Sequence, residues 1–156
     1  RRDWCDYARD TQGELLRIVL SDGGLDKILS YVKDRSSKLK RREIDPSKLI
    51  IWEKITRLLK DYVAKGAHIT VAAQLAEKGW KIKKGDYVGY VITTGDGPLY
   101  KRAKHYTEAS PEQIDTGYYV EKQVLPVCSR VTSVLGIKMK ELKILVSGED
   151  LFSYEQ

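Results

Sequence analysis

Residues 117–136 constrain the fold of this chain more than any other stretch. Valines recur there in alternating steps of four and three residues, at Val120, Val124, Val127, Val131 and Val134. This spacing places all five side chains on one face of an α-helix, and lysine, arginine and serine lie on the opposite face. The stretch therefore predicts a helix with one buried face.

Pro126 interrupts this helical pattern. Because proline has no N–H group, the carbonyl of Lys122 loses its usual helical partner, and a kink is expected there. Gly136 suits the end of the helix, since glycine readily adopts the left-handed conformation that closes many helices. Residues 117–136 are therefore predicted to form one long kinked helix.

The preceding residues predict a pair of helices. Apolar side chains recur at helical spacing in residues 4–19 and again in residues 25–39, with the turn sequence Asp22-Gly23-Gly24 between them. Such a short connection favours antiparallel packing of the two helices. Asp45-Pro46 is expected to separate this pair from the middle of the chain, because a residue before proline avoids the helical conformation.

A small β element is expected in the middle of the chain. Residues 49–55, 87–92 and 103–106 have the composition of strands, residues 65–79 that of a helix rich in small residues, and residues 138–143 that of a short last helix. We therefore predict a single α+β domain that is mainly α. A helical hairpin would span residues 1–44, a β-containing tip residues 45–110, and the kinked return helix with a tail residues 111–156.

Charge is concentrated in the middle of the 156 residues. The chain has a net charge of +6, and residues 47–107 contain 12 lysines and arginines against 5 aspartates and glutamates. A basic region of this kind suits a polyanion partner. No run approaches the roughly 18 apolar residues of a membrane span, so no membrane partner is expected. The two cysteines lack disulfide or metal spacing, which favours a reducing compartment.

Several residues of the basic middle are candidates for phosphate contact. Thr56 and Arg57 follow a predicted strand, and a hydroxyl beside a guanidinium suits a phosphate grip, although a surface arginine in a salt bridge gives the same pattern. His68 and Lys65 lie near a predicted helix start, which favours anions, although a lone histidine is more often structural. Three further lysines form a local positive cluster: Lys81, Lys83 and Lys84.

The string YYVEKQVLP at residues 118–126 resembles the "YY.E.Q.LP" segment in the thumb of archaeal-type family B DNA polymerases. Four more stretches resemble that thumb in the same order. They are RRDWCDYARDTQ at residues 1–12, ITRLLKDY at 55–62, KGAHITVAAQLAEKG at 65–79, and the pattern "G.KI..G..VGY.I..G.GP" in 79–98. The resemblance spans residues 1 to about 142.

This resemblance implies a function in DNA replication. A thumb of this family holds the primer–template duplex mainly from the minor-groove side, through phosphates and sugars. Arg1 and Arg2 belong to the motif at the junction of palm and thumb, which lies close to the DNA backbone in the family. Tyr118, Tyr119 and Lys122 precede the apolar stripe and are further candidates for the DNA-facing side, with Lys122 standing where the family often has asparagine.

The chain contains neither aspartate motif with which the family holds its metal ions, "D..SLYPS" or "YGDTD". We therefore expect no catalytic residue here and no activity of the chain alone, with Mg²⁺ held in the palm of the parent polymerase. Cys5, Cys128, His68 and His105 lack the paired spacing of a metal site. Ser129 and His105 lack the motifs of a hydrolase.

The resemblance also implies partners. These are double-stranded primer–template DNA and the remainder of a polymerase, with its palm, fingers and exonuclease, in the cytoplasm at the nucleoid. The chain opens on Arg1 rather than methionine, and we expect it to be part of a longer protein. A sliding clamp is not expected to bind the tail, because Phe152 and Tyr154 are not adjacent and no suitable glutamine precedes them. Alternatives are a small subunit of a split polymerase and a free-standing, non-specific nucleic-acid-binding module.

Overall fold

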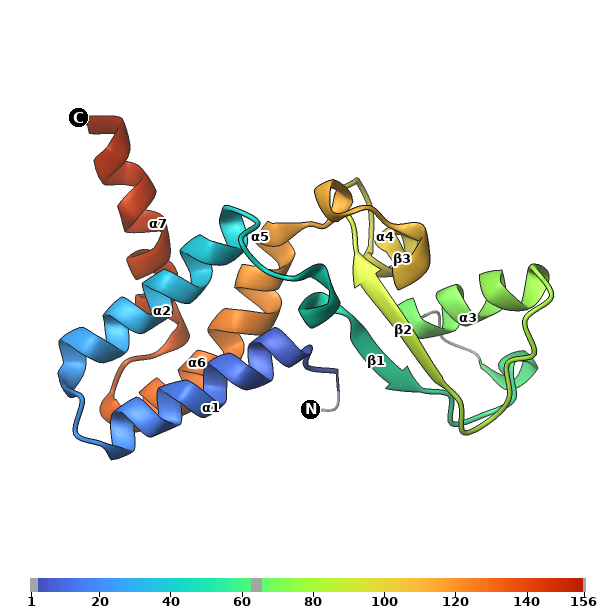
Figure 1. The fold of residues 1–156 in the computed structure, drawn as a ribbon, viewed down its shortest axis with the longest axis horizontal. Coiled ribbons are helices and arrows are strands. Elements are labelled where there is room, and N and C mark those ends of the chain that lie inside the picture. The colour runs from blue at the N-terminus through green and yellow to red at the C-terminus, as the bar shows by residue number, and fades with distance from the viewer. Residues whose placement is uncertain (1–2, 63–65, 156) are drawn as a thin grey trace. The chain divides into compact units, whose positions relative to one another are not determined.

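The computed structural model describes residues 3–62 and 66–155, with side chains described as far as residue 147. The chain divides into two compact units. The helical unit comprises Asp6–Asp45 and Thr116–Gln156, and the β unit comprises Arg1–Cys5 and Pro46–Asp115. Helices dominate and one small antiparallel sheet is present, which confirms the predicted α+β, mainly α class (Figure 1).

The predicted helical hairpin is confirmed as α1 (Asp6–Leu20) and α2 (Gly24–Lys40). Polar contacts join the two helices beside their apolar faces. The Tyr7 hydroxyl donates to the Arg35 carbonyl at 2.7 Å, and Arg35 Nε donates to the Thr11 hydroxyl at 2.9 Å. The Arg35 guanidinium lies 3.7 Å from the centre of the Tyr7 ring, a cation–π contact. Burial raises the pKa of Tyr7 to about 12, so its hydroxyl remains a donor at neutral pH.

The return helix is a continuous helical run with a widened turn in it. It consists of α5 (Thr116–Tyr119), the π-helical turn η5 (Val120–Val124), α6 (Leu125–Thr132) and the 3₁₀ turn η6 (Ser133–Leu135). Within it, Leu125 N–H bonds the carbonyl of Val120, five residues back. The disturbance predicted around Pro126 thus takes the form of a π turn, which ends at Val124, two residues before the proline that lacks an N–H group. Gly136 has φ of 84° and closes the run as predicted.

The buried stripe of the return helix is shorter than its sequence pattern. Val120, Val124, Val127 and Val131 are buried, whereas Val134 is 85% exposed. The prediction for Val134 is therefore wrong. The helix tightens into a 3₁₀ turn at Ser133, and three residues per turn instead of 3.6 rotate the next side chain off the buried face.

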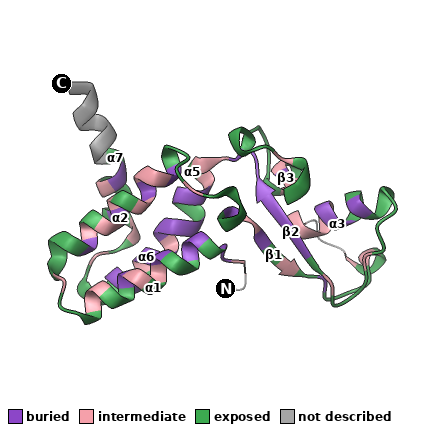
Figure 2. Ribbon diagram, in the orientation of Figure 1, coloured by how far each residue is buried: buried purple, intermediate pink, exposed green. Residues whose placement is uncertain are grey.

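The last helix is longer than predicted. In place of a short helix over residues 138–143, α7 spans Met139–Glu155. Its start is capped by the Glu141 carboxylate, which accepts a hydrogen bond from the Lys138 N–H at 2.9 Å. Leu142 and Val146, four residues apart, are both buried, so the apolar face continues past the predicted end (Figure 2).

The β unit is built on a three-stranded antiparallel sheet in the order β1-β2-β3. Its strands are β1 (Ile51–Lys54), β2 (Tyr87–Ile92) and β3 (Ala103–His105), where strands were predicted. The helix α3 (Ala67–Glu77) packs against β2 and β3 through Val71, Ala72 and Leu75 (Figure 1). The short helix α4 (Leu99–Arg102) connects β2 to β3. No described helix combines the length and the apolar character needed to cross a membrane.

His105, at the end of β3, is a buried titratable group of the β unit. Its ring is 4% exposed and lies between Trp80 and Tyr106, with ring centres 5.3 and 4.4 Å away. Its Nδ1 is 2.6 Å from the Thr107 hydroxyl. Burial lowers the pKa of His105, because the charged imidazolium would lose its hydration. The folded state therefore favours neutral His105.

We expect the β unit to lose stability as the pH falls through and below about 6.5, the ordinary pKa of imidazole. The unfolded chain takes up a proton on His105 at a higher pH than the folded chain does, so acid favours unfolding. Urea midpoints followed by tryptophan fluorescence measure this effect, because Trp4, Trp52 and Trp80 all belong to this unit. On acidification, the urea midpoint of the variant His105→Gln should fall by less than that of the wild type. Equal losses in the two proteins would contradict the assignment to His105.

Candidate nucleic-acid interface

Thr56 and Arg57 directly follow a firmly held strand end. The Ile55 N–H bonds the Asp86 carbonyl, and the Ile55 carbonyl accepts from the Gly85 N–H, both at 2.7 Å. Ile55 itself is 1% exposed, so its side chain anchors this point in the core of the β unit. The next two residues, Thr56 and Arg57, are exposed. The backbone hydrogen bonds of Ile55 thus lie directly before two exposed side chains.

The same hydrogen bonds bring a lysine-rich turn next to Thr56 and Arg57. In this turn the Lys83 N–H donates a hydrogen bond to the Asp86 carboxylate at 2.8 Å, and the Asp86 N–H donates one to the Lys83 carbonyl at 3.0 Å. Gly85 has φ of 98°, a conformation that favours glycine. Lys83 and Lys84 are exposed, as is Lys81 just before the turn.

We call Thr56, Arg57, Lys81, Lys83 and Lys84 the basic edge of the β unit. Its four cations come from two segments that are about 25 residues apart in the sequence, and the pairing at Ile55 joins them. Arg57 forms no ion pair with any residue that the structure describes. The described residues thus give no support to the alternative that Arg57 is a surface arginine in a salt bridge. Exposed cations on a fixed backbone are suited to phosphate contact.

Tyr62 is a polar group of this region that the sequence patterns did not single out. Its hydroxyl accepts hydrogen bonds from the backbone N–H groups of Thr56, at 2.9 Å, and of Arg57, at 3.2 Å. The Thr56 hydroxyl lies 3.2 Å from the same oxygen. The hydrogen bond with the Thr56 hydroxyl, and then those from the backbone N–H groups, lower the pKa of Tyr62. The position of Tyr62 in the string ITRLLKDY was the one available signal.

His68 lies near the start of α3, as predicted, but it faces an acidic partner. Its Nδ1 contacts the Glu53 carboxylate of β1, which also accepts a hydrogen bond from the Tyr90 hydroxyl at 3.2 Å. A carboxylate at this position repels a phosphate. This geometry argues against a phosphate contact by His68 and favours the structural alternative. Lys65 lies outside the described residues.

The remaining candidates belong to the helical unit or lie outside the described residues. The prediction that Tyr119 faces DNA is wrong for its side chain, which is 0% exposed because the helical run turns it into the core. Tyr118 is half-buried against Tyr119, with ring centres 5.1 Å apart, and Lys122 is exposed on the π turn. Arg1 and Arg2 are not among the described residues.

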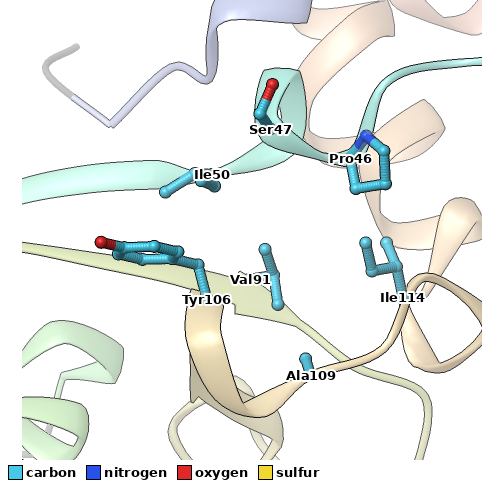
Figure 3. Close-up of a pocket in the computed structure, with 7 residues that line it drawn as sticks. All are labelled: Pro46, Ser47, Ile50, Val91, Tyr106, Ala109 and Ile114. Carbon is cyan, nitrogen blue, oxygen red and sulfur yellow. The ribbon is translucent and has the colours of Figure 1, made fainter.

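An apolar pocket of about 180 Å³ lies on another part of the β unit. The residues that line it are Pro46, Ser47, Ile50, Val91, Tyr106, Ala109 and Ile114 (Figure 3). None of these side chains is charged, and the hydroxyls of Ser47 and Tyr106 are the polar side-chain groups among them. The lining therefore lacks carboxylate, imidazole, amine and thiol groups, and its one titratable side chain is the Tyr106 phenol.

Among the described residues, no group of three or more histidine, cysteine, aspartate or glutamate side chains is placed to hold a metal ion. Cys5 and Cys128 are buried, and neither is in a disulfide bond. Burial raises the pKa of Cys128 to about 12, so it stays protonated at neutral pH.

Comparisons with known proteins agree with the motifs. The model of DNA polymerase family B matches residues 1–135. DNA polymerase 2 of Aeropyrum pernix is 42% identical over 143 residues, which are 92% of this chain and 18% of that protein. The DNA polymerase of Pyrococcus horikoshii is 40% identical over 145 residues, which are 92% of this chain and 12% of that protein.

A solved structure is also similar. The family B DNA polymerase from the hyperthermophilic archaeon Pyrobaculum calidifontis matches with a TM-score of 0.78 and 35% identity, covering 87% of this chain and 18% of that one. The chain thus spans less than a fifth of the length of these relatives. With a family model matched over most of its residues, the chain belongs to DNA polymerase family B.

Proposed function

We propose that this chain is the thumb of a family B DNA polymerase and that it holds primer–template DNA by its sugar-phosphate backbone. The observation that carries the proposal is the basic edge, where a hydrogen-bonded strand end places Thr56 and Arg57 beside Lys83 and Lys84. Contacts of this kind carry no sequence information, which suits an enzyme that copies any template. Lys122, exposed on the helical unit, is a second proposed contact.

The proposal assigns the chemistry of synthesis to other parts of the polymerase. Those parts would hold Mg²⁺ on the aspartates that this sequence lacks, and the metal would stabilise the charge that develops on the transferred phosphoryl group. The residues of this chain would keep the duplex in place while that chemistry proceeds. Such a protein would work at the nucleoid, with primer–template DNA and the remainder of the polymerase as its partners.

The variant Arg57→Ala tests the grip. We expect it to weaken binding of a DNA duplex by about 1–2 kcal/mol, because one phosphate contact is lost. The slope of log Kd against log salt concentration should fall by roughly one, since about one counterion fewer is released on binding. Fluorescence anisotropy with duplexes of unrelated sequence, at several salt concentrations, measures both quantities. The loss should be equal for all sequences.

A matched control is Arg17→Ala on α1. Arg17 is an exposed arginine that pairs with Glu14 at 3.2 Å, and it lies in the other unit. Its removal should leave duplex affinity close to wild type. A loss with Arg57→Ala that is confined to one DNA sequence, or an equal loss in the two variants, would contradict a backbone grip at the basic edge.

A further inference from the structure

The backbone of Thr56 and Arg57 carries two successive N–H groups that point to one oxygen. The oxygen is the Tyr62 hydroxyl, at 2.9 Å from the first nitrogen and 3.2 Å from the second. The Thr56 side-chain hydroxyl is 3.2 Å from the same atom. Consecutive N–H groups that converge in this way are fixed in one backbone conformation for as long as the shared acceptor is present.

The chain returns to this position through a short 3₁₀ turn. The turn, η2 (Leu59–Asp61), is closed by the Asp61 N–H bond to the Leu58 carbonyl at 2.9 Å. The Tyr62 ring then lies edge-on to the His68 ring, with ring centres 6.2 Å apart. The ring of Tyr62 is therefore held by α3, and its hydroxyl is directed back to Thr56 and Arg57.

The Tyr62 hydroxyl is the group that ties the N–H groups of Thr56 and Arg57 to the described part of the fold, because the β ladder ends at Lys54 and the backbone hydrogen bonds beside it end at Ile55. An exposed segment that is not hydrogen-bonded samples many conformations, and ordering each residue on binding costs roughly 1–2 kcal/mol. A side chain on such a segment binds more weakly than the same side chain on an ordered one.

We propose that Tyr62 is a positioning residue for nucleic-acid binding, which holds the Thr56–Arg57 backbone through its hydroxyl so that Arg57 is presented to a DNA phosphate. This inference rests on the proposed function of the basic edge. Tyr62 acts through Arg57 and makes no phosphate contact of its own. The hydrogen bonds of the phenol oxygen with the Thr56 side chain and then with the backbone N–H groups also lower the pKa of Tyr62, which agrees with this geometry.

The test is a set of three variants: Tyr62→Phe, Arg57→Ala, and the two combined. Tyr62→Phe keeps the ring against His68 and removes the hydroxyl alone. We expect it to weaken duplex binding by roughly fivefold, the effect of about one hydrogen bond, and to lower the salt slope as Arg57→Ala does. The double variant should bind no more weakly than Arg57→Ala, because the hydroxyl acts through that arginine.

Tyr87→Phe is the matched control, since Tyr87 is a tyrosine of the same unit whose side chain is 64% exposed on β2. Its duplex affinity should match the wild type. Circular dichroism below the thermal midpoint of each variant ensures that folded proteins are compared. If Tyr62 positions a charged contact, Tyr62→Phe lowers the slope of log Kd against log salt. If the variant only loses stability, the protein that remains folded binds DNA with the wild-type slope.

The outcomes separate the two proposals. If Arg57→Ala weakens binding and Tyr62→Phe does not, the grip stands and the positioning role of Tyr62 is refuted. If Tyr62→Phe binds DNA more tightly than wild type, the hydroxyl competes with the phosphate for the same donors, which also refutes it. Additive losses in the double variant would show that Tyr62 acts independently of Arg57. If Arg57→Ala has no effect, the proposed function of the basic edge fails first.

Discussion

Replacing Val127 by aspartate is expected to unfold the helical unit. Val127 is 0% exposed on α6, and its backbone carbonyl accepts a hydrogen bond from the Gln12 side chain of α1 at 3.1 Å. A carboxylate at this position would lose its hydration without gaining a partner, because the nearby Gln12 amide is already engaged. We expect a loss of about 4 kcal/mol or more, which is a large part of the stability of a small unit. Far-UV circular dichroism in a urea titration measures it.

Val134→Asp is the matched control in the same helical run. Both valines belong to the stripe in the sequence, but Val134 is 85% exposed. Aspartate there should change the unfolding free energy by no more than about 0.5 kcal/mol, as is usual for exposed positions. A large loss with Val134→Asp would show that the stripe is buried along its whole length. A small loss with Val127→Asp would show that α6 does not bury this side chain against α1.

The second large effect is expected in DNA synthesis. The chain alone should bind primer–template with a Kd on the order of micromolar at moderate salt, as non-specific contacts do, and should add no nucleotide with Mg²⁺ and all four triphosphates. When it is combined with the exonuclease, palm and fingers portion of a family B polymerase, products should lengthen. We expect DNA to dissociate at least about tenfold more slowly, because several phosphate contacts are added together.

Primer extension with and without a trap for released enzyme distinguishes retention from chemistry. The rate of one incorporation from a saturated complex should change less than the product length, since a thumb keeps DNA in place and holds no reacting group. The combination with Arg57→Ala should give shorter products than the wild-type combination. Nucleotide addition by the chain alone would refute its assignment as non-catalytic. Products of unchanged length would refute the thumb.

Local sequence patterns predicted the helices and strands of this chain well, and they predicted burial less well. The hairpin, the three strands and the interruption at Pro126 follow from spacing within one segment, which is a local property. Val134 and Tyr119 show the limit. Val134 leaves the buried face because η6 changes the helical period, and Tyr119, the last residue of α5 before the π turn, is buried. Neither change of helix type is visible in the pattern of apolar residues.

The sequence by itself determined the class of fold, the positive charge of the middle segment and, through motifs at matching spacing, the resemblance to family B polymerases. The packing of the chain decided which cations lie on neighbouring segments. Arg57 and Lys84 lie about 27 residues apart in the sequence, and the pairing of Ile55 with Gly85 and Asp86 brings their two segments side by side. The Glu53 carboxylate beside His68 and the Tyr62 hydroxyl at the Thr56 N–H group are likewise contacts between elements. Such contacts depend on how strands and helices pack, and the spacing within one segment carries no information about them.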